Sequence, residues 1–335
     1  MAGQSSGVAE TGQIQADSKR EMLSGIALLG RGEWRGALAC FERAIALRET
    51  LPWRDDPESA WVLAAAWLNR SDALRGLGEA GRLPEVVRSL DRAIEAMGFV
   101  PLAEHPAFVE RLILAWLNRG TACGEAGETE AALESFARAE SLLAEWGRDV
   151  TPQRRFLHSM LQVNRARVRL DAGQIDEAWN DARTGLESLR ALEPGEGEIA
   201  QAGVRARSVW CQVLAALLDR PDGAERAGDW IAAATDAAEE ALAIVKRRGL
   251  AEPWVADLIR YGAKIYRACQ PQFLREFIDE WLAADSPLAG DEPLRAEMRD
   301  VLQVARAEAE ARLLLAPHDD AVAQREMRIL RALGG

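Results

Sequence analysis

The chain has 335 residues and a formal net charge of −12, with 48% hydrophobic and 28% charged residues. This composition is ordinary for a soluble globular chain, so it excludes wholesale disorder and collagen-like structure. No uncharged apolar run reaches the length of about 18 residues that a membrane-spanning helix needs, so no membrane insertion is expected. The acidic balance argues against nonspecific nucleic-acid binding, which requires a dense cationic surface.

The N-terminal segment carries no sign of a secretory signal, because residues 1–17 lack both a charged region and an apolar region. We interpret residues 1–17 as a disordered tail. Ser18 and Glu21 have the spacing of a capping box, which predicts that the first helix begins at Ser18. The four cysteines (Cys40, Cys123, Cys211 and Cys269) form no CxxC pair. We therefore expect free thiols in a reducing cytoplasm.

A repeat is visible in the spacing of glycines that precede helical patterns. Gly32, Gly81, Gly127, Gly173 and Gly228 are separated by 46 to 55 residues. After each glycine, small and large apolar residues recur at offsets that place them on one face of a helix. In the first four units these residues are Ala37, Phe41 and Ala44; Val86, Leu90 and Ala93; Ala132, Phe136 and Ala139; and Ala178, Ala182 and Gly185. The fifth unit is weaker.

A second motif lies upstream of the glycines. Trp67-Leu68-Asn69-Arg70-Ser71 and Trp116-Leu117-Asn118-Arg119-Gly120 are near copies, and Gln162-Val163-Asn164-Arg165-Ala166 is a degenerate third copy. Each copy lies in a segment that is predicted to be helical, over residues 57–77, 106–124 and 152–171. Pro57, Pro84 and Pro152 suit the first turn of a helix. The chain is thus predicted to consist of successive helix pairs.

The combined pattern of W-x-N-x-G, a turn glycine and A-x3-F-x2-A resembles the tetratricopeptide repeat, a helix-turn-helix unit. The resemblance covers roughly residues 18–248. It implies an all-α, right-handed α-solenoid of about five helix pairs with C-terminal capping helices. The spacing exceeds the family's usual length of about 34 residues. We expect the extra residues mainly in the first helix of each pair.

The repeat fades in residues 249–335. We predict a degenerate helix pair there, over residues 253–269 and 271–284, followed by closing helices over 292–315 and 319–332. Repeat arrays need terminal units with a polar outer face, and these helices fit that role. A separate helical domain, hinged near residues 285–290, is the alternative.

Catalytic motifs are absent from the sequence. It contains no P-loop, HExxH, GxSxG or EF-hand pattern, and its three histidines are isolated from one another. We therefore predict no enzymatic activity, no cofactor and no metal site. A helical enzyme would need a buried cluster of His, Asp and Glu, which the sequence does not reveal.

The resemblance also implies a binding surface, a concave groove lined by the first helices. By position in the motif, the candidate partner-binding residues are Asn69, Asp72, Arg75, Asn118, Thr121, Asn164 and Arg167. A primary amide both donates and accepts hydrogen bonds, so a row of asparagines could hold an extended backbone. Alternatively, these asparagines cap or bridge helices. Arg165 and Arg169 are a weaker candidate as an anion clamp, and ordinary ion pairs are the favoured interpretation.

The predicted function is that of a cytoplasmic, non-catalytic adaptor that binds a protein or peptide partner in this groove. The alternative is a regulatory sensor that switches an effector protein when a ligand or peptide binds. Self-association through the C-terminal helices is also an open alternative, with apolar faces at Leu313, Leu314, Leu315, Ile329 and Leu330.

Overall fold

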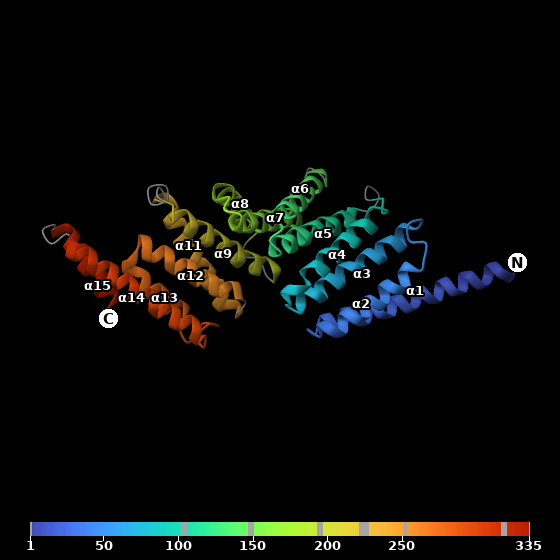
Figure 1. Cartoon of the computed structure of the whole chain (residues 1–335), viewed down its shortest axis with the longest axis horizontal. Helices are drawn as coiled ribbons and strands as arrows, with labels where there is room; N and C mark the ends of the chain where they lie inside the picture. Colours follow the sequence, from blue (N-terminus) through green and yellow to red (C-terminus); the bar gives the residue numbers. More distant parts are fainter. Residues whose placement is uncertain are drawn as a thin grey trace. The chain divides into compact units, whose positions relative to one another are not determined.

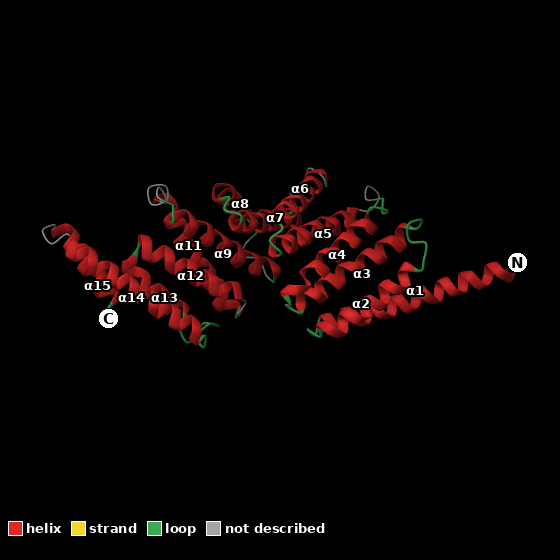
Figure 2. Cartoon of the chain, in the orientation of Figure 1, coloured by secondary structure: helices red, strands yellow, loops and turns green. Residues whose placement is uncertain are grey.

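The computed structural model of the chain describes residues 2–101, 106–146, 151–192, 197–220, 228–250, 253–315 and 320–334. Over these ranges the regular secondary structure is helical and contains no strand (Figure 2). The predicted all-α class is therefore confirmed. The chain divides into two compact units, residues 1–168 and 169–335.

The N-terminal unit is a succession of paired helices (Figure 1). It contains α1 (Ala2–Leu29), α2 (Trp34–Glu49), α3 (Pro57–Gly76), the short 3-10 helix η1 (Ala80–Arg82), α4 (Leu83–Met97), α5 (Pro106–Glu125), α6 (Thr129–Glu145) and most of α7 (Pro152–Asp171). The helices pack as the pairs α1 with α2, α3 with α4, and α5 with α6. Each pair contacts the next through α2 with α3 and α4 with α5. This is the packing of a helical repeat.

The regular secondary structure of the C-terminal unit is also helical over its described residues. It contains α8 (Ile175–Arg190), α9 (Glu198–Leu218), α11 (Gly228–Arg248), α12 (Pro253–Cys269), the 3-10 helix η2 (Pro271–Phe273), α13 (Leu274–Trp281), α14 (Glu292–Leu315) and α15 (Asp320–Leu333). Helix α9 packs against α8, α11 and α12, and α14 packs against α12, α13 and α15. Packing therefore continues past residue 248, where the sequence pattern fades. The capping role of the last helices stays a prediction, as does the right-handed sense of the superhelix.

The predicted helix starts at prolines are confirmed. Helix α3 begins at Pro57, and the carboxylate of Asp56 accepts hydrogen bonds from the backbone N–H groups of Glu58 and Ser59 at 3.3 and 3.1 Å. Helix α7 begins at Pro152, where the Thr151 hydroxyl accepts from the N–H of Arg154 at 3.2 Å. These side chains satisfy N–H groups that have no partner within the helix.

Three of the repeat glycines end the first helix of a pair in the left-handed backbone region. Gly32, Gly127 and Gly173 have φ angles of +73°, +79° and +75°, which glycine adopts without strain. In the second unit the positive φ belongs to Gly78, whereas the repeat glycine Gly81 lies in η1. The reason is that η1 lengthens this turn and moves Gly81 beyond the end of α3.

The structure corrects the predicted start of the first helix. Helix α1 begins at Ala2 and runs through residues 2–17, which the sequence analysis assigned to a disordered tail. Ser18 is buried inside the helix and does not cap it. Its hydroxyl donates to the Ala44 carbonyl at 3.4 Å and accepts from Nε of Arg48 at 3.1 Å. Once α1 is held against α2, extending it costs little, because propagation is much easier than nucleation.

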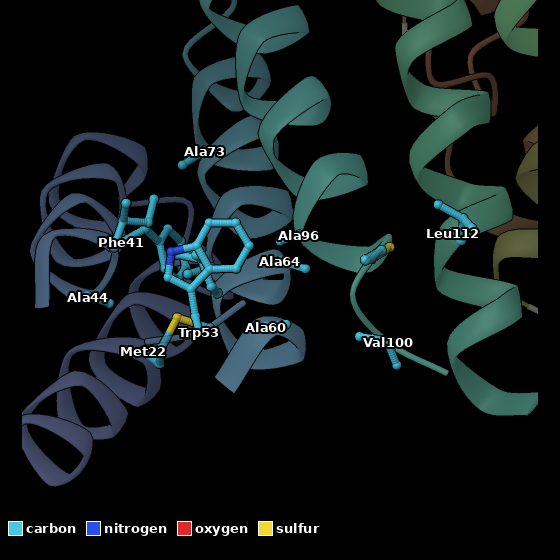
Figure 3. Packing of buried hydrophobic residues seen from close by; sticks show 14 of the residues in the cluster. Met22, Phe41, Ala44, Trp53, Ala60, Ala64, Ala73, Ala96, Val100 and Leu112 are labelled. Carbon is cyan, nitrogen blue, oxygen red and sulfur yellow. The ribbon is translucent and has the colours of Figure 1, made fainter. Parts of the chain in front are cut away.

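In two pairs of the N-terminal unit, α1 with α2 and α5 with α6, a glycine of the first helix meets an aromatic ring of the second. A Cβ atom on Gly25 would lie 2.5 Å from Cε1 of Phe41, and one on Gly120 would lie 2.6 Å from Cε1 of Phe136. Both phenylalanines are fully buried. Figure 3 shows Phe41 beside Met22 and Trp53 in the first core cluster. Glycine thus permits the close approach of the two helices.

The other small and large residues of the repeat are also buried, each in its own helix pair or cluster. The predicted positions in the first four units are buried: Ala37, Phe41, Ala44, Val86, Leu90, Ala93, Ala132, Phe136, Ala139, Ala178, Ala182 and Gly185. Burial of a single Phe or Leu side chain stabilises a fold by about 1.5–3 kcal/mol. The apolar stripe read from the sequence is therefore the main source of packing energy within each pair.

We expect Gly120→Ala to destabilise the protein. Overpacking of the Phe136 ring costs about 1–3 kcal/mol, which exceeds the gain of about 1 kcal/mol from alanine's better helix propensity. The control is Gly12→Ala, because a Cβ there meets nothing within 4 Å. Urea unfolding should show a lower midpoint for Gly120→Ala and an equal or higher one for Gly12→Ala. Equal stability of the Gly120→Ala variant and the wild type would contradict this packing argument.

Candidate functional site

The predicted partner-binding residues lie on α3, α5 and α7, the first helices of successive pairs. The motif asparagines stand at equivalent positions on the three helices, and the other candidates follow within two turns. Side chains from α3 and α5 meet at the ion pair between Nη2 of Arg75 and Oε1 of Glu125, at 3.2 Å. The first helices of neighbouring pairs thus contribute to one surface.

The three motif asparagines have hydrogen-bonding capacity that the described part of the chain does not use. Asn69 and Asn118 are half-buried, and neither amide bonds to another described residue. Asn164 is 7% exposed, and its Oδ1 has no partner among the described residues. A buried acceptor without a partner costs about 1–3 kcal/mol. The helix-bridging alternative therefore receives no support from the contacts of these amides.

The arginine that follows the asparagine in the motif has a different role. Nη1 of Arg70 donates to the Ser89 hydroxyl on α4 at 2.7 Å, and Nη2 forms an ion pair with Glu42 on α2 at 3.0 Å. Arg70 thus connects α3 to the second helices on both sides. Sequence reasoning missed this role, although the arginine is present in both near copies of the motif.

The same connection recurs in the next unit. Nη1 of Arg119 donates to the Ser135 hydroxyl on α6 at 2.7 Å, and Nε pairs with Asp91 on α4 at 2.6 Å. In the degenerate copy, Arg165 pairs with Glu140 at 2.9 Å. Charge-assisted hydrogen bonds of this kind are stronger than neutral ones. These arginines fix the spacing of the helices that carry the asparagines.

The proposed anion clamp of the fourth unit receives no support. Arg165 is paired with Glu140, and Nη1 of Arg169 is 2.7 Å from Oδ2 of the buried Asp181. Both guanidinium groups therefore already have carboxylate partners. The ion-pair interpretation of these two arginines is confirmed.

Asp72 has an unusual electrostatic environment. Its side chain is open to solvent, yet protein atoms surround much of the carboxyl group and reduce its hydration. This desolvation raises the pKa of Asp72, and the nearby guanidinium groups of Arg75 and Arg111 oppose the shift only in part. A carboxyl group that is both accessible and poorly hydrated is available for a partner's cation or hydrogen-bond donor.

The remaining two candidates differ in exposure. Thr121 is buried, and its hydroxyl donates to the Leu117 carbonyl in the preceding turn at 3.0 Å. Arg167 is exposed on α7. The accessible side chains among the candidates are thus those of Asp72 and Arg167, with Asn69, Arg75 and Asn118 partly accessible.

The structure offers little to a metal or a redox cofactor in its described part. Across the described ranges, no three His, Cys, Asp or Glu side chains are grouped as metal ligands. The four cysteines are free thiols, and three of them are buried. Burial raises the pKa of Cys211 to about 12, which suppresses its thiolate. None of the described helices has the length and hydropathy to cross a bilayer.

Comparison with known proteins identifies the fold. No protein-family model matches the chain, and no curated protein matches its sequence. The structure is similar to the crystal structure of a tetratricopeptide repeat protein from Parabacteroides merdae, with a TM-score of 0.50 and 15% sequence identity. The match covers 96% of this chain and 100% of that one. The chain therefore has the tetratricopeptide-repeat fold that its motifs predict, with lengthened repeats.

We expect Asp72→Asn to stabilise the protein at pH 7. The folded state raises the pKa of Asp72 above its unfolded value, so it favours the neutral carboxyl and disfavours the carboxylate. The advantage of the variant should be present at neutral pH. It should disappear as the pH falls below about 4, where the carboxyl group is protonated in both states. Thermal unfolding from pH 3 to pH 8 measures this difference.

The matched control for this prediction is Asp300→Asn. Asp300 is also exposed in the middle of a helix, and it forms no ion pair within the described chain. Its substitution should produce a smaller change in stability at pH 7. A lower stability of Asp72→Asn at neutral pH would show that the favourable effect of Arg75 and Arg111 outweighs desolvation.

Proposed function

We propose that the chain is a non-catalytic adaptor that holds an extended segment of a protein or peptide partner along α3, α5 and α7. The supporting observation is the set of three equivalent asparagines, whose amides retain unused hydrogen-bonding capacity. The amides of Asn69 and Asn118 are partly accessible, so each can donate to a partner's carbonyl and accept from its N–H group, whereas Asn164 is buried. Contacts with a partner's backbone would make binding tolerant of its side chains.

Charged side chains beside the asparagines would add orientation and selectivity. Asp72 and Arg75 follow Asn69 on α3, and Arg167 follows Asn164 on α7. We propose that they contact charged side chains of the partner, while the buried Thr121 shapes the surface. Ion pairs such as Arg119 with Asp91 hold the helices in place before binding. Pre-organisation of this kind lowers the entropy lost on association.

The net charge supports the proposed class of partner, and the free thiols support the proposed location. A chain with a net charge of −12 repels nucleic acid, so we propose a protein or peptide partner in the cytoplasm. A second copy of the chain is a further candidate, because Leu314 and Leu315 are 79% and 84% exposed at the end of α14. Ile329 is 2% exposed and packs within its own unit, so it is not available for this contact.

The double variant Asn69→Ala/Asn118→Ala tests the proposal. The protein is used as bait in cell lysate, and captured proteins are quantified by mass spectrometry against wild-type bait. Loss of two amide contacts should reduce capture of the specific partner by about tenfold or more, since each hydrogen bond contributes about 0.5–1.5 kcal/mol. Circular dichroism and thermal unfolding check that the variant is folded.

Asn180→Ala is the matched control, because Asn180 is an exposed asparagine on the second helix α8. It should capture the partner as well as the wild type does. Equal capture by all three baits would exclude the asparagine row as the binding site. If the double variant and Asn180→Ala both captured less of the partner, the binding surface would not be confined to α3, α5 and α7.

A further inference from the structure

A cavity of about 390 Å³ lies in the C-terminal unit, among α13, α14 and the end of α15. These helices contact one another and carry the last colours of the sequence in Figure 1. The cavity is lined by four arginines, Arg275, Arg295, Arg299 and Arg306. Its apolar lining includes Ile278, Leu282, Met298 and Leu333, all of which are buried. Small-molecule sites have volumes in this range, about 300–1,000 Å³.

The cavity-lining arginines of α14 lie on the helix face directed toward α13, where apolar residues usually pack. Arg295, Arg299, Leu302 and Arg306 are separated by four, three and four residues, so they follow one side of the helix. An apolar stripe at these positions would pack against α13 and leave no space. Guanidinium groups cannot be buried without partners, so the two helices enclose an open cavity instead.

Three of these guanidinium groups have no carboxylate partner in the described chain. Nε and Nη2 of Arg275 donate to the Leu333 carbonyl at 3.1 and 2.8 Å. Arg295 donates to the carbonyl groups of Ala289 and Leu282. Arg299 makes no hydrogen bond or ion pair with any described residue. Since a guanidinium group has several N–H donors, donors remain unused in each case.

The local charge is opposite to that of the whole chain. Among the described residues, Asp279 is the one carboxylate that lines the cavity, so four guanidinium groups face one side-chain carboxylate in a chain with a net charge of −12. Glu276 and Glu280 are also on α13, but they line a different cavity together with Tyr266. Arg306 pairs with Glu310 at 3.1 Å, and both side chains are about half exposed. This ion pair leaves the positive charge inside the cavity largely uncompensated.

We infer that this cavity binds a small organic anion, namely a carboxylate or phosphate group attached to an apolar body. Guanidinium groups grip both anions with paired hydrogen bonds, and Arg299 is the group with all its donors available. The apolar lining from Ile278, Met298 and Leu333 would receive the body of the ligand. This site is separate from α3, α5 and α7 and does not depend on the proposed adaptor function.

Isothermal titration calorimetry with 1-naphthyl phosphate, 1-naphthylacetate and the neutral 1-naphthylacetamide tests the proposal. At least one anion should bind the wild-type chain about tenfold more tightly than the amide, because only the anions form charge-assisted hydrogen bonds. Its affinity should fall as the salt concentration rises. Preference for the phosphate or the acetate identifies which anionic group the site favours.

Arg299→Gln should weaken binding of the preferred anion by about tenfold or more and leave the fold intact, since Arg299 forms no hydrogen bond or ion pair with another described residue. The control is Arg328→Gln on α15, which removes an exposed arginine outside the cavity. Arg306→Gln is a second test variant, because the ion pair of Arg306 within the described chain is with the exposed Glu310. Anions that bind no better than the amide would overturn the proposal, and so would unchanged affinity in both cavity variants. The Asn69→Ala/Asn118→Ala variant should bind the anion normally, which separates this site from the adaptor surface.

Discussion

The close approach of paired helices is the constraint on which the other contacts depend, and in several pairs a glycine opposite an aromatic ring permits it. It places Gly25 against Phe41 and Gly120 against Phe136 in the N-terminal unit. The same contact recurs between Gly262 of α12 and Phe277 of α13, beyond the point where the sequence repeat fades. Helices α12 and α13 therefore follow the packing rule of the repeat even though its motifs have been lost. Because the ring leaves no room for a Cβ atom, glycine is required there for packing and not for chain flexibility.

The asparagine and the arginine of the W-L-N-R motif are neighbours in sequence but differ in their contacts when the helices are closely packed. Arg70 and Arg119 are long enough to reach both neighbouring second helices, and each finds a serine and a carboxylate. The shorter Asn69 and Asn118 reach no partner in the described chain. The arginine thus secures the position of the helix, while the asparagine keeps its amide available. This division follows from side-chain length and helix geometry.

The sequence predicted the features that depend on local chemistry. These features are the turns at Gly32, Gly127 and Gly173, the helix starts at prolines and the buried A-x3-F-x2-A stripe, and all of them have local causes. The predicted cap at Ser18 was wrong because the Ser18 hydroxyl hydrogen-bonds to Ala44 and Arg48 on α2. The contacts of Arg70 and Arg119 could not be predicted from the sequence either, since their partners lie 15 to 28 residues away on other helices. The arginine-lined cavity has no local signal, because its walls come from three helices.

Several groups in the two units are held in arrangements that do not favour the stability of the isolated chain. The Asn164 oxygen is buried without a partner in the described chain, the carboxylate of Asp72 is poorly hydrated, and four guanidinium groups line a cavity in which Asp279 is the one carboxylate among the described lining residues. Each arrangement costs free energy that a single substitution would recover. The paired arginines of the repeat show that polar groups in this fold commonly have partners, so the unsatisfied groups are exceptions. Natural chains retain such costs mainly where a bound group removes them. The unsatisfied polar groups are therefore the strongest structural argument that both units bind something, and their chemistry differs: neutral amides in the first unit and cations in the second.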